Sequence, residues 1–116
     1  MAISESFTGS ATIGTAQYDL PSASTTVSAQ TADGIYQLFL DLSNLTATES
    51  YRLRIYEKVE SSGTQRVIDD TTLSGAQTAE PVYVTAALLL MHGWTYTLTK
   101  LQGTDRAIAW SIRQVA

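Results

Sequence analysis

The chain has 116 residues, no cysteine and a formal net charge of −4. The acidic balance argues against a general nucleic-acid binder, which needs clustered Lys and Arg, and the missing thiols exclude a disulfide framework, a thiolate metal site and a catalytic cysteine. A chain of this length fits one domain over residues 1–116 with a core of its own.

The first 34 residues are rich in Ser, Thr, Ala and Gly, with short alternating patches at 6–13 and 16–20. Small polar side chains build little core, so residues 1–34 are expected to form edge strands or an extended N-terminal arm that is ordered against a neighbour. Pro21 should end the second patch because proline lacks the backbone donor of a ladder. Another short strand is expected at 25–27.

Residues 35–60 hold two alternating runs around a polar connection, the pattern of two half-buried strands. Successive side chains of a strand point to opposite faces, so each run has a core face and an outer face. Leu45, six residues before Tyr51, gives a spacing that resembles the tyrosine corner of immunoglobulin-like sandwiches, and a plain buried tyrosine is the alternative. The predicted core residues are Tyr36, Leu38, Leu40, Leu42, Tyr51, Leu53 and Ile55.

The outer faces of these two runs supply the residues predicted to contact a partner. Aromatic side chains and Arg are enriched in protein interfaces, although single exposed aromatics are also common on ordinary surfaces. The predicted interface consists of Arg52, Arg54, Tyr56, Lys58 and Phe39.

The second half of the chain continues with strand patterns. Turn residues at 61–63 and an alternating run at 65–73 predict a hairpin with the strand before them. Residues 82–91 read as one strand whose continuous apolar end predicts burial on both faces, as a central strand, a strand that changes sheets, or one covered by a partner.

The C-terminal region predicts a second hairpin, with its turn at 102–105. No apolar pattern of period 3.6 with caps predicts a helix. Seven or eight strands at this spacing predict an all-β, two-sheet antiparallel β-sandwich, of jelly-roll or immunoglobulin-like connectivity. The core-facing residues of the hairpin are Trp94, Tyr96, Leu98, Ile108, Trp110 and Ile112.

No constellation for catalysis, a cofactor or a metal is predicted. The lone His92 has no G-x-S-x-G nucleophile motif to serve and is interpreted as a turn residue. Asp69 and Asp70 are adjacent in a strand and point to opposite faces, without a calcium-loop motif. Glu57 and Glu60 also fall on opposite faces, which argues against a glycosidase pair. The protein is therefore expected not to be an enzyme.

Neither a secretory signal nor a membrane span is predicted. The N-terminus has no positively charged region followed by a continuous apolar stretch. The longest apolar run, residues 86–91, is too short to cross a bilayer. No membrane partner is therefore expected.

Three stretches, MAISESFTGSATIGTAQYDLP, YRLRIYEKV and HGWTYTLTKLQGTDRAIAWSIRQVA, carry a resemblance across the whole chain. The sequence resembles small β-sandwich proteins encoded among the head genes of tailed bacteriophages, above all capsid decoration or cement proteins. The resemblance implies a non-enzymatic virion protein that is made in the host cytoplasm, sits on the capsid surface and bridges major capsid protein subunits. It also implies a homo-oligomer, with a trimer as one form.

Two further functions stay open from the sequence. One is another phage part with the same sandwich, such as a head-completion, tail or baseplate component. The other is a carbohydrate-binding or adhesin-like module, which should expose two or three aromatic side chains in a groove.

Overall fold

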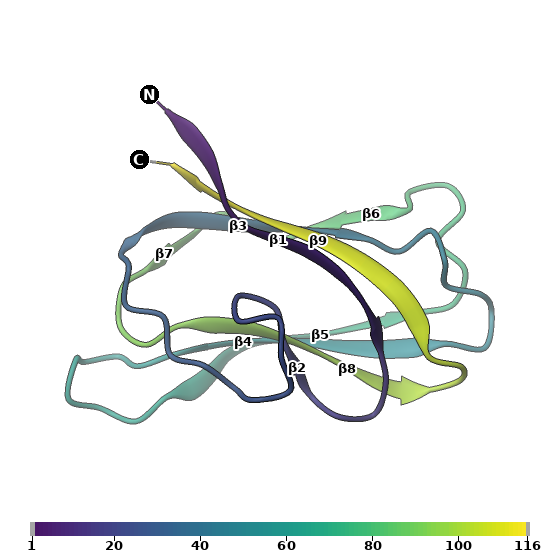
Figure 1. The fold of residues 1–116 in the computed structure, drawn as a ribbon, viewed down its shortest axis with the longest axis horizontal. Helices are drawn as coiled ribbons and strands as arrows, with labels where there is room; N and C mark the ends of the chain where they lie inside the picture. The colour runs from purple at the N-terminus through teal and green to yellow at the C-terminus, as the bar shows by residue number, and fades with distance from the viewer. Residues whose placement is uncertain (1, 116) are drawn as a thin grey trace.

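The computed structural model describes residues 2–115, which form nine β-strands in two layers and no helix, hence none long and apolar enough to span a membrane (Figure 1). The five-stranded sheet has the order β1-β9-β3-β6, with β7 also paired to β3, and the four-stranded sheet has the order β2-β8-β4-β5. The strands are β1 (Ile3–Ile13), β2 (Tyr18–Asp19), β3 (Gly34–Asp41), β4 (Ser50–Glu57), β5 (Arg66–Ser74), β6 (Val82–Val84), β7 (Leu88–Leu90), β8 (Thr95–Gln102) and β9 (Arg106–Val115).

The connections between strands identify the topology. Apart from the β4–β5 hairpin and the short step from β6 to β7, every connection crosses from one sheet to the other. When β6 and β7 are counted as two parts of one strand, this is the connectivity of a jelly roll. The all-β, two-sheet antiparallel sandwich predicted from the sequence is confirmed, with nine strands where seven or eight were expected, and the jelly-roll alternative is the one that applies.

The predicted core faces of the central strands are confirmed. All seven of the predicted core side chains in β3, β4 and the residue after β3 are at most 1% exposed. Trp94 lies at the centre of an aromatic cluster, with its ring centroid 4.3 Å from that of Tyr36, 5.9 Å from that of Phe7 and 6.0 Å from that of Tyr96. Its indole Nε1 donates a hydrogen bond of 2.9 Å to the carbonyl of Ala32. This cluster joins the two sheets.

The tyrosine-corner interpretation of Tyr51 is wrong. Its hydroxyl does not bond to nearby upstream backbone. It donates to the carbonyl of Ile13 at 2.8 Å and accepts from the amide of Arg106 at 2.9 Å. Ile13 and Arg106 are register partners in β1 and β9, so the Tyr51 hydroxyl bridges the end of one strand to the start of the other. The residue is the buried tyrosine of the alternative interpretation, at the start of β4.

The predicted C-terminal hairpin is also wrong, whereas the β4–β5 hairpin is confirmed. Strand β8 pairs with β2 and β4, and β9 pairs with β1 and β3, so the two strands lie in different sheets. Both send their apolar faces into one core, from opposite sides. An alternating pattern identifies the buried face of a strand but not the side of the core on which the strand lies, which is why the sequence suggested a hairpin.

Residues 82–91 are not one strand buried on both faces. They form two short strands, β6 and β7, that both pair with β3. Leu90 is buried, but Leu89 is 79% exposed and Met91 is 50% exposed. The apolar run therefore covers the core with one face and presents the other to the surface.

The N-terminal segment contributes two strands, β1 and β2, that lie at sheet edges. Strand β1 pairs with β9 along its length, and β2 has only two residues. The strand expected at 25–27 is absent. Asp19 holds this loop instead, because its buried carboxylate accepts hydrogen bonds from the amide of Ser22 and from the amide and hydroxyl of Ser28. Such local side-chain bonds compete with strand formation.

Glu49, just before β4, is a buried carboxylate that the sequence did not single out. Its oxygens accept hydrogen bonds from the hydroxyl of Thr48, from the amide and hydroxyl of Thr46, and from the guanidinium of Arg106. These donors, the Thr48 hydroxyl first, hold the pKa of Glu49 well below its ordinary value of 4.5. The ionised form is thus stabilised in the folded protein.

This arrangement predicts acid-sensitive stability. Because the folded-state pKa lies below the unfolded value, the contribution of Glu49 is complete above about pH 4.5 and is lost as the pH falls toward the folded pKa. Glu49→Gln should remove this contribution, so that the free energy of unfolding falls less steeply as the pH is lowered. Urea unfolding of both proteins from pH 7 down to pH 3 should show a steeper fall in the free energy of unfolding for the native sequence, and parallel curves would contradict the assignment.

Candidate protein interface

The outer face of the five-stranded sheet carries a row of apolar side chains, which we call the outer apolar row: Leu89, Ile35, Val115 and Ile3. Leu89 is the register partner of Ile35, Ile35 of Val115, and Val115 of Ile3, so the row crosses β7, β3, β9 and β1 in turn. Register partners lie on the same face with their Cβ atoms about 5 Å apart. Leu89 and Ile3 are 79% and 68% exposed.

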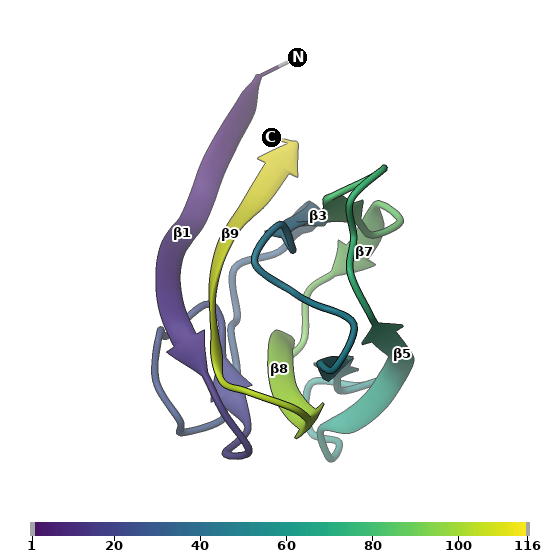
Figure 2. The ribbon, with the colours of Figure 1, turned by 90° about the vertical axis from the view of Figure 1, so that its right-hand side faces the viewer.

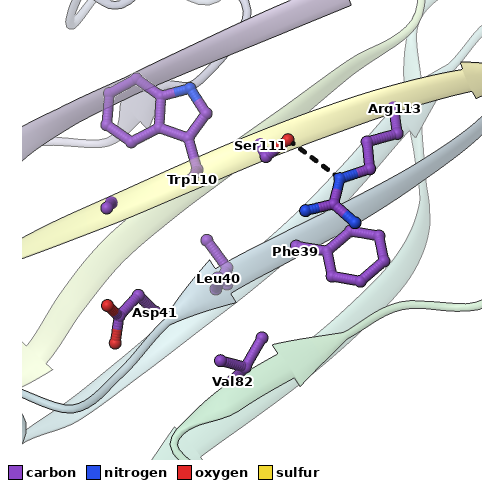
Figure 3. Close-up of a pocket in the computed structure, with 8 residues that line it drawn as sticks. Phe39, Leu40, Asp41, Val82, Trp110, Ser111 and Arg113 are labelled. Atoms are coloured by element: carbon purple, nitrogen blue, oxygen red, sulfur yellow. Dashed lines mark hydrogen bonds between the residues drawn. The ribbon is translucent and has the colours of Figure 1, made fainter. Parts of the chain in front are cut away.

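A cation–aromatic pair lies on the same face. The guanidinium of Arg113 lies 3.8 Å from the centre of the Phe39 ring, and its Nε donates to the hydroxyl of Ser111 (Figure 3). Stacking of this kind stabilises an exposed pair by about 0.5–1 kcal/mol. Val84, the register partner of Phe39, is also exposed, as is Val82. The face is therefore apolar over several strands, and it also carries Arg113 with its register partner Glu5, together with Asp41.

Two shallow hollows flank the Arg113–Phe39 pair. One, of about 220 Å³, lies against Val82 and Ala109, and the other, of about 160 Å³, lies against Ile3 and Ile35 of the outer apolar row. Phe39 and Arg113 line both. A surface with apolar side chains, shallow hollows and a stacked arginine has the composition of a protein interface.

The outer face of the four-stranded sheet is different. Arg52 and Arg54 both approach Asp70 on the neighbouring strand, with nitrogen–oxygen distances of 3.7 and 3.1 Å. The hydroxyl of Tyr56 accepts a hydrogen bond of 2.7 Å from the side-chain amide of Gln17. Arg54 and Tyr56 are thus hydrogen-bonded within the chain, whereas the Nε of Arg52 makes no hydrogen bond.

The structure does not bring the predicted interface residues onto one surface. Phe39 is on the outer face of the five-stranded sheet, whereas Arg52, Arg54 and Tyr56 are on the outer face of the other sheet. Lys58 follows the end of β4 and lines a separate hollow beside His92 at one end of the sandwich. The prediction that these residues are neighbours is wrong, because it assigned outward positions without knowing which sheet each strand joins.

The residues of the outer apolar row were not predicted as a site. The signal was present in 82–91, where the apolar residues exceed what one buried face requires and where cover by a partner was one interpretation. Ile3 and Val115 gave no signal, since only the strand registers place Val115 beside Ile35 and Ile3 beside Val115.

The residues that were considered for catalysis or metal binding make hydrogen bonds and ion pairs within the fold. Both backbone amides at Met91 and His92 donate to the carboxylate of Glu57, which ties the loop before β8 to the end of β4. Within residues 2–115, no three His, Cys, Asp or Glu residues gather as metal ligands. Asp70 pairs with arginines.

Exposed aromatic side chains, the expected mark of a carbohydrate-binding groove, are missing. All two Phe, six Tyr and two Trp residues lie in the part of the chain that the structure describes, and none is exposed. Phe39 is half-buried, and Arg113 lies over its ring. A sugar could stack on the Phe39 ring only if the Arg113 guanidinium moved away from it.

Comparison with known proteins finds no matching family model and no matching curated protein. Among solved structures, the chain is similar to a xylan-binding domain of CBM 22, with 15% identity and a TM-score of 0.39 over 86% of this chain. It is also similar to the C-terminal family 22 carbohydrate binding module of Clostridium thermocellum Xyn10B, with 16% identity and a TM-score of 0.37 over 72% of this chain.

A third similar structure is that of the CBM22-1-GH10 modules of the N-terminal endo-1,4-beta-D-xylanase 10B of Clostridium thermocellum, with 15% identity and a TM-score of 0.35 over 76% of this chain. The chain spans 64%, 55% and 17% of these three structures, which is less than two thirds of each. At such identities and TM-scores the likeness assigns no function.

Proposed function

We propose that this protein is a non-enzymatic structural protein that attaches to a larger protein shell, and that the shell is the head of a tailed bacteriophage, where it acts as a capsid decoration protein. One observation carries the proposal: the outer face of the five-stranded sheet is crossed by the exposed outer apolar row, whereas the outer face of the four-stranded sheet carries Arg52, Arg54 and Asp70. The resemblance of the sequence to decoration proteins supplies the partner, the major capsid protein.

The apolar face suits attachment in many copies. Burying one large apolar side chain contributes about 1.5–3 kcal/mol, and association of two proteins costs several kcal/mol, so a patch of this size gives modest binding at a single site. A shell offers the same site repeatedly, and contacts between neighbouring copies add to each. A stable core with no further chemistry is all that this task requires.

The test is binding to purified phage heads that lack the protein. Leu89→Asp places a charge in the outer apolar row at a side chain that is 79% exposed, so the fold should be kept. Binding should weaken at least about tenfold, the effect of roughly 1.4 kcal/mol. Val59→Asp, at a side chain that is 89% exposed in the loop after β4, is the matched control and should bind as the native sequence does. Co-sedimentation gives the bound fraction.

Four outcomes would overturn the proposal or relocate the site. Equal binding by Leu89→Asp and the native sequence would remove the five-stranded sheet as the contact surface. If Arg52→Glu weakens binding to heads and Leu89→Asp does not, the contact lies on the four-stranded sheet. Saturable binding of an oligosaccharide, with no binding to heads, would favour a carbohydrate-binding module, and recovery with phage tails at low copy number would favour a tail component.

A further inference from the structure

The free edge of β1 differs from the other sheet edges. In the four-stranded sheet, β2 has two residues and β5 carries Arg66, Asp69 and Asp70; in the five-stranded sheet, β6 and β7 have three residues each. Strand β1 has 11 residues, no Lys, Arg or Pro, and Glu5 as its single charge. Short length, charges and proline are the usual means of protecting an edge from pairing with another chain, and β1 has hardly any of them.

This edge has no strand beside it. Within residues 2–115, β1 pairs with β9 alone, and Figure 2 shows β1 at the margin of the sheet. The register shifts between Glu5 and Phe7, and from Phe7 to Ile13 the strand then pairs with β9 residue for residue. Phe7–Ile13 is thus a regular stretch of open edge.

The sequence of this stretch, FTGSATI, reads almost the same in both directions from Ser10 when residues of similar size and polarity are treated as equal. In an antiparallel pair related by a two-fold axis at Ser10, each residue therefore faces an identical or a similar residue. The pairs would be Phe7 with Ile13, Thr8 with Thr12, Gly9 with Ala11, and Ser10 with Ser10 of the other copy.

These pairs are compatible with a sheet that continues across the axis. Thr8, Ser10 and Thr12 are exposed, and cross-strand Thr and Ser pairs stabilise a sheet by about 0.2–1 kcal/mol each relative to Ala pairs. No charge lies in the stretch, so a chain with a net charge of −4 meets its copy without like charges at the contact. Gly9 is small because a Cβ there would lie 2.6 Å from the Trp110 ring.

We infer that two copies of this chain pair β1 with β1 in antiparallel fashion about a two-fold axis at Ser10, so that their five-stranded sheets become one continuous sheet. The contact is isologous, with the same surface used by both copies. It covers the most open edge of the free protein and sets two outer apolar faces side by side. The inference stands on the edge of β1 and does not depend on a capsid as partner.

The test uses charge exchange at the axis. Ser10→Lys and Ser10→Glu each place two like charges opposite each other, so each variant alone should dissociate at least about tenfold more readily than the native dimer. An equimolar mixture should restore the dimer as a Lys–Glu pair. Sedimentation velocity over a concentration series measures the dissociation, and circular dichroism checks the fold. Thr72→Lys, on the β5 edge, is the matched control and should stay dimeric.

A native protein that stays monomeric throughout the series would overturn the inference. So would a Ser10→Lys variant as dimeric as the native chain, a mixture that stays monomeric, or a native trimer. None of these results depends on how Leu89→Asp binds to phage heads, so either proposal can fail without the other.

Discussion

Trp94→Ala is expected to lower the free energy of unfolding by about 3–5 kcal/mol. The side chain is fully buried, its ring contacts those of Tyr36, Phe7 and Tyr96, and its Nε1 bonds to Ala32. Truncation removes the ring that joins the two sheets and leaves a cavity that strands fixed by their ladders cannot fill. Urea unfolding followed by circular dichroism measures the loss.

An exposed position provides the control for this change. Leu101→Ala, at a side chain that is 44% exposed near the end of β8, should change the free energy of unfolding by less than about 0.5 kcal/mol. A loss below about 1 kcal/mol for Trp94→Ala would mean that the aromatic cluster is not the centre of the core.

Tyr51→Phe is the second large expected effect, at about 2–3 kcal/mol. The change removes one hydroxyl and leaves the ring in place. The carbonyl of Ile13 and the amide of Arg106 then both lose their partner at the junction of β1 and β9. Leaving buried backbone groups without partners costs more than the bond itself contributes. Urea unfolding again gives the difference.

Tyr96→Phe is the matched control, because it deletes the same atom from an equally buried tyrosine. The Tyr96 hydroxyl is buried, bridges no backbone groups and makes no hydrogen bond of ordinary geometry, with the Thr85 side chain nearby. Removing it should leave stability unchanged or raise it slightly, since an unpaired polar group is taken out of the core. Equal losses for the two variants would show that the bridging role of Tyr51 is wrong.

The sequence was sufficient for the fold class and for the faces of the strands. Side chains alternate in a strand, so the buried positions of β3 and β4 followed directly from the placement of Leu, Ile and Tyr. The hairpin of β4 and β5 followed from the turn residues at 61–63 between two alternating runs. Both inferences use information within one strand or between strands close in the chain.

What the sequence missed depends on pairing between distant strands. The pattern of β8 and β9 suits a hairpin as well as two strands on opposite sides of one core, and only the full set of partners separates these cases. The same reason accounts for the predicted interface. Phe39 and Arg54 were both correctly placed on outer faces, but they belong to different sheets.

The outer apolar row shows this dependence most clearly. Ile3, Ile35, Leu89 and Val115 lie far apart in the sequence and become neighbours through three separate registers. Each is an unremarkable apolar residue in its own strand. Only the surplus of apolar residues in 82–91 indicated that part of the surface would be apolar.

Side-chain labelling by hydroxyl radicals, read by mass spectrometry on the free and the head-bound protein, tests the contact surface most directly. We expect labelling of Leu89, Met91 and Phe39 to fall on binding, while labelling of Val59, Val67 and Ile68 stays the same. Unchanged labelling of Leu89 and Phe39, together with protection of Val67 and Ile68 on β5, would contradict attachment through the five-stranded sheet.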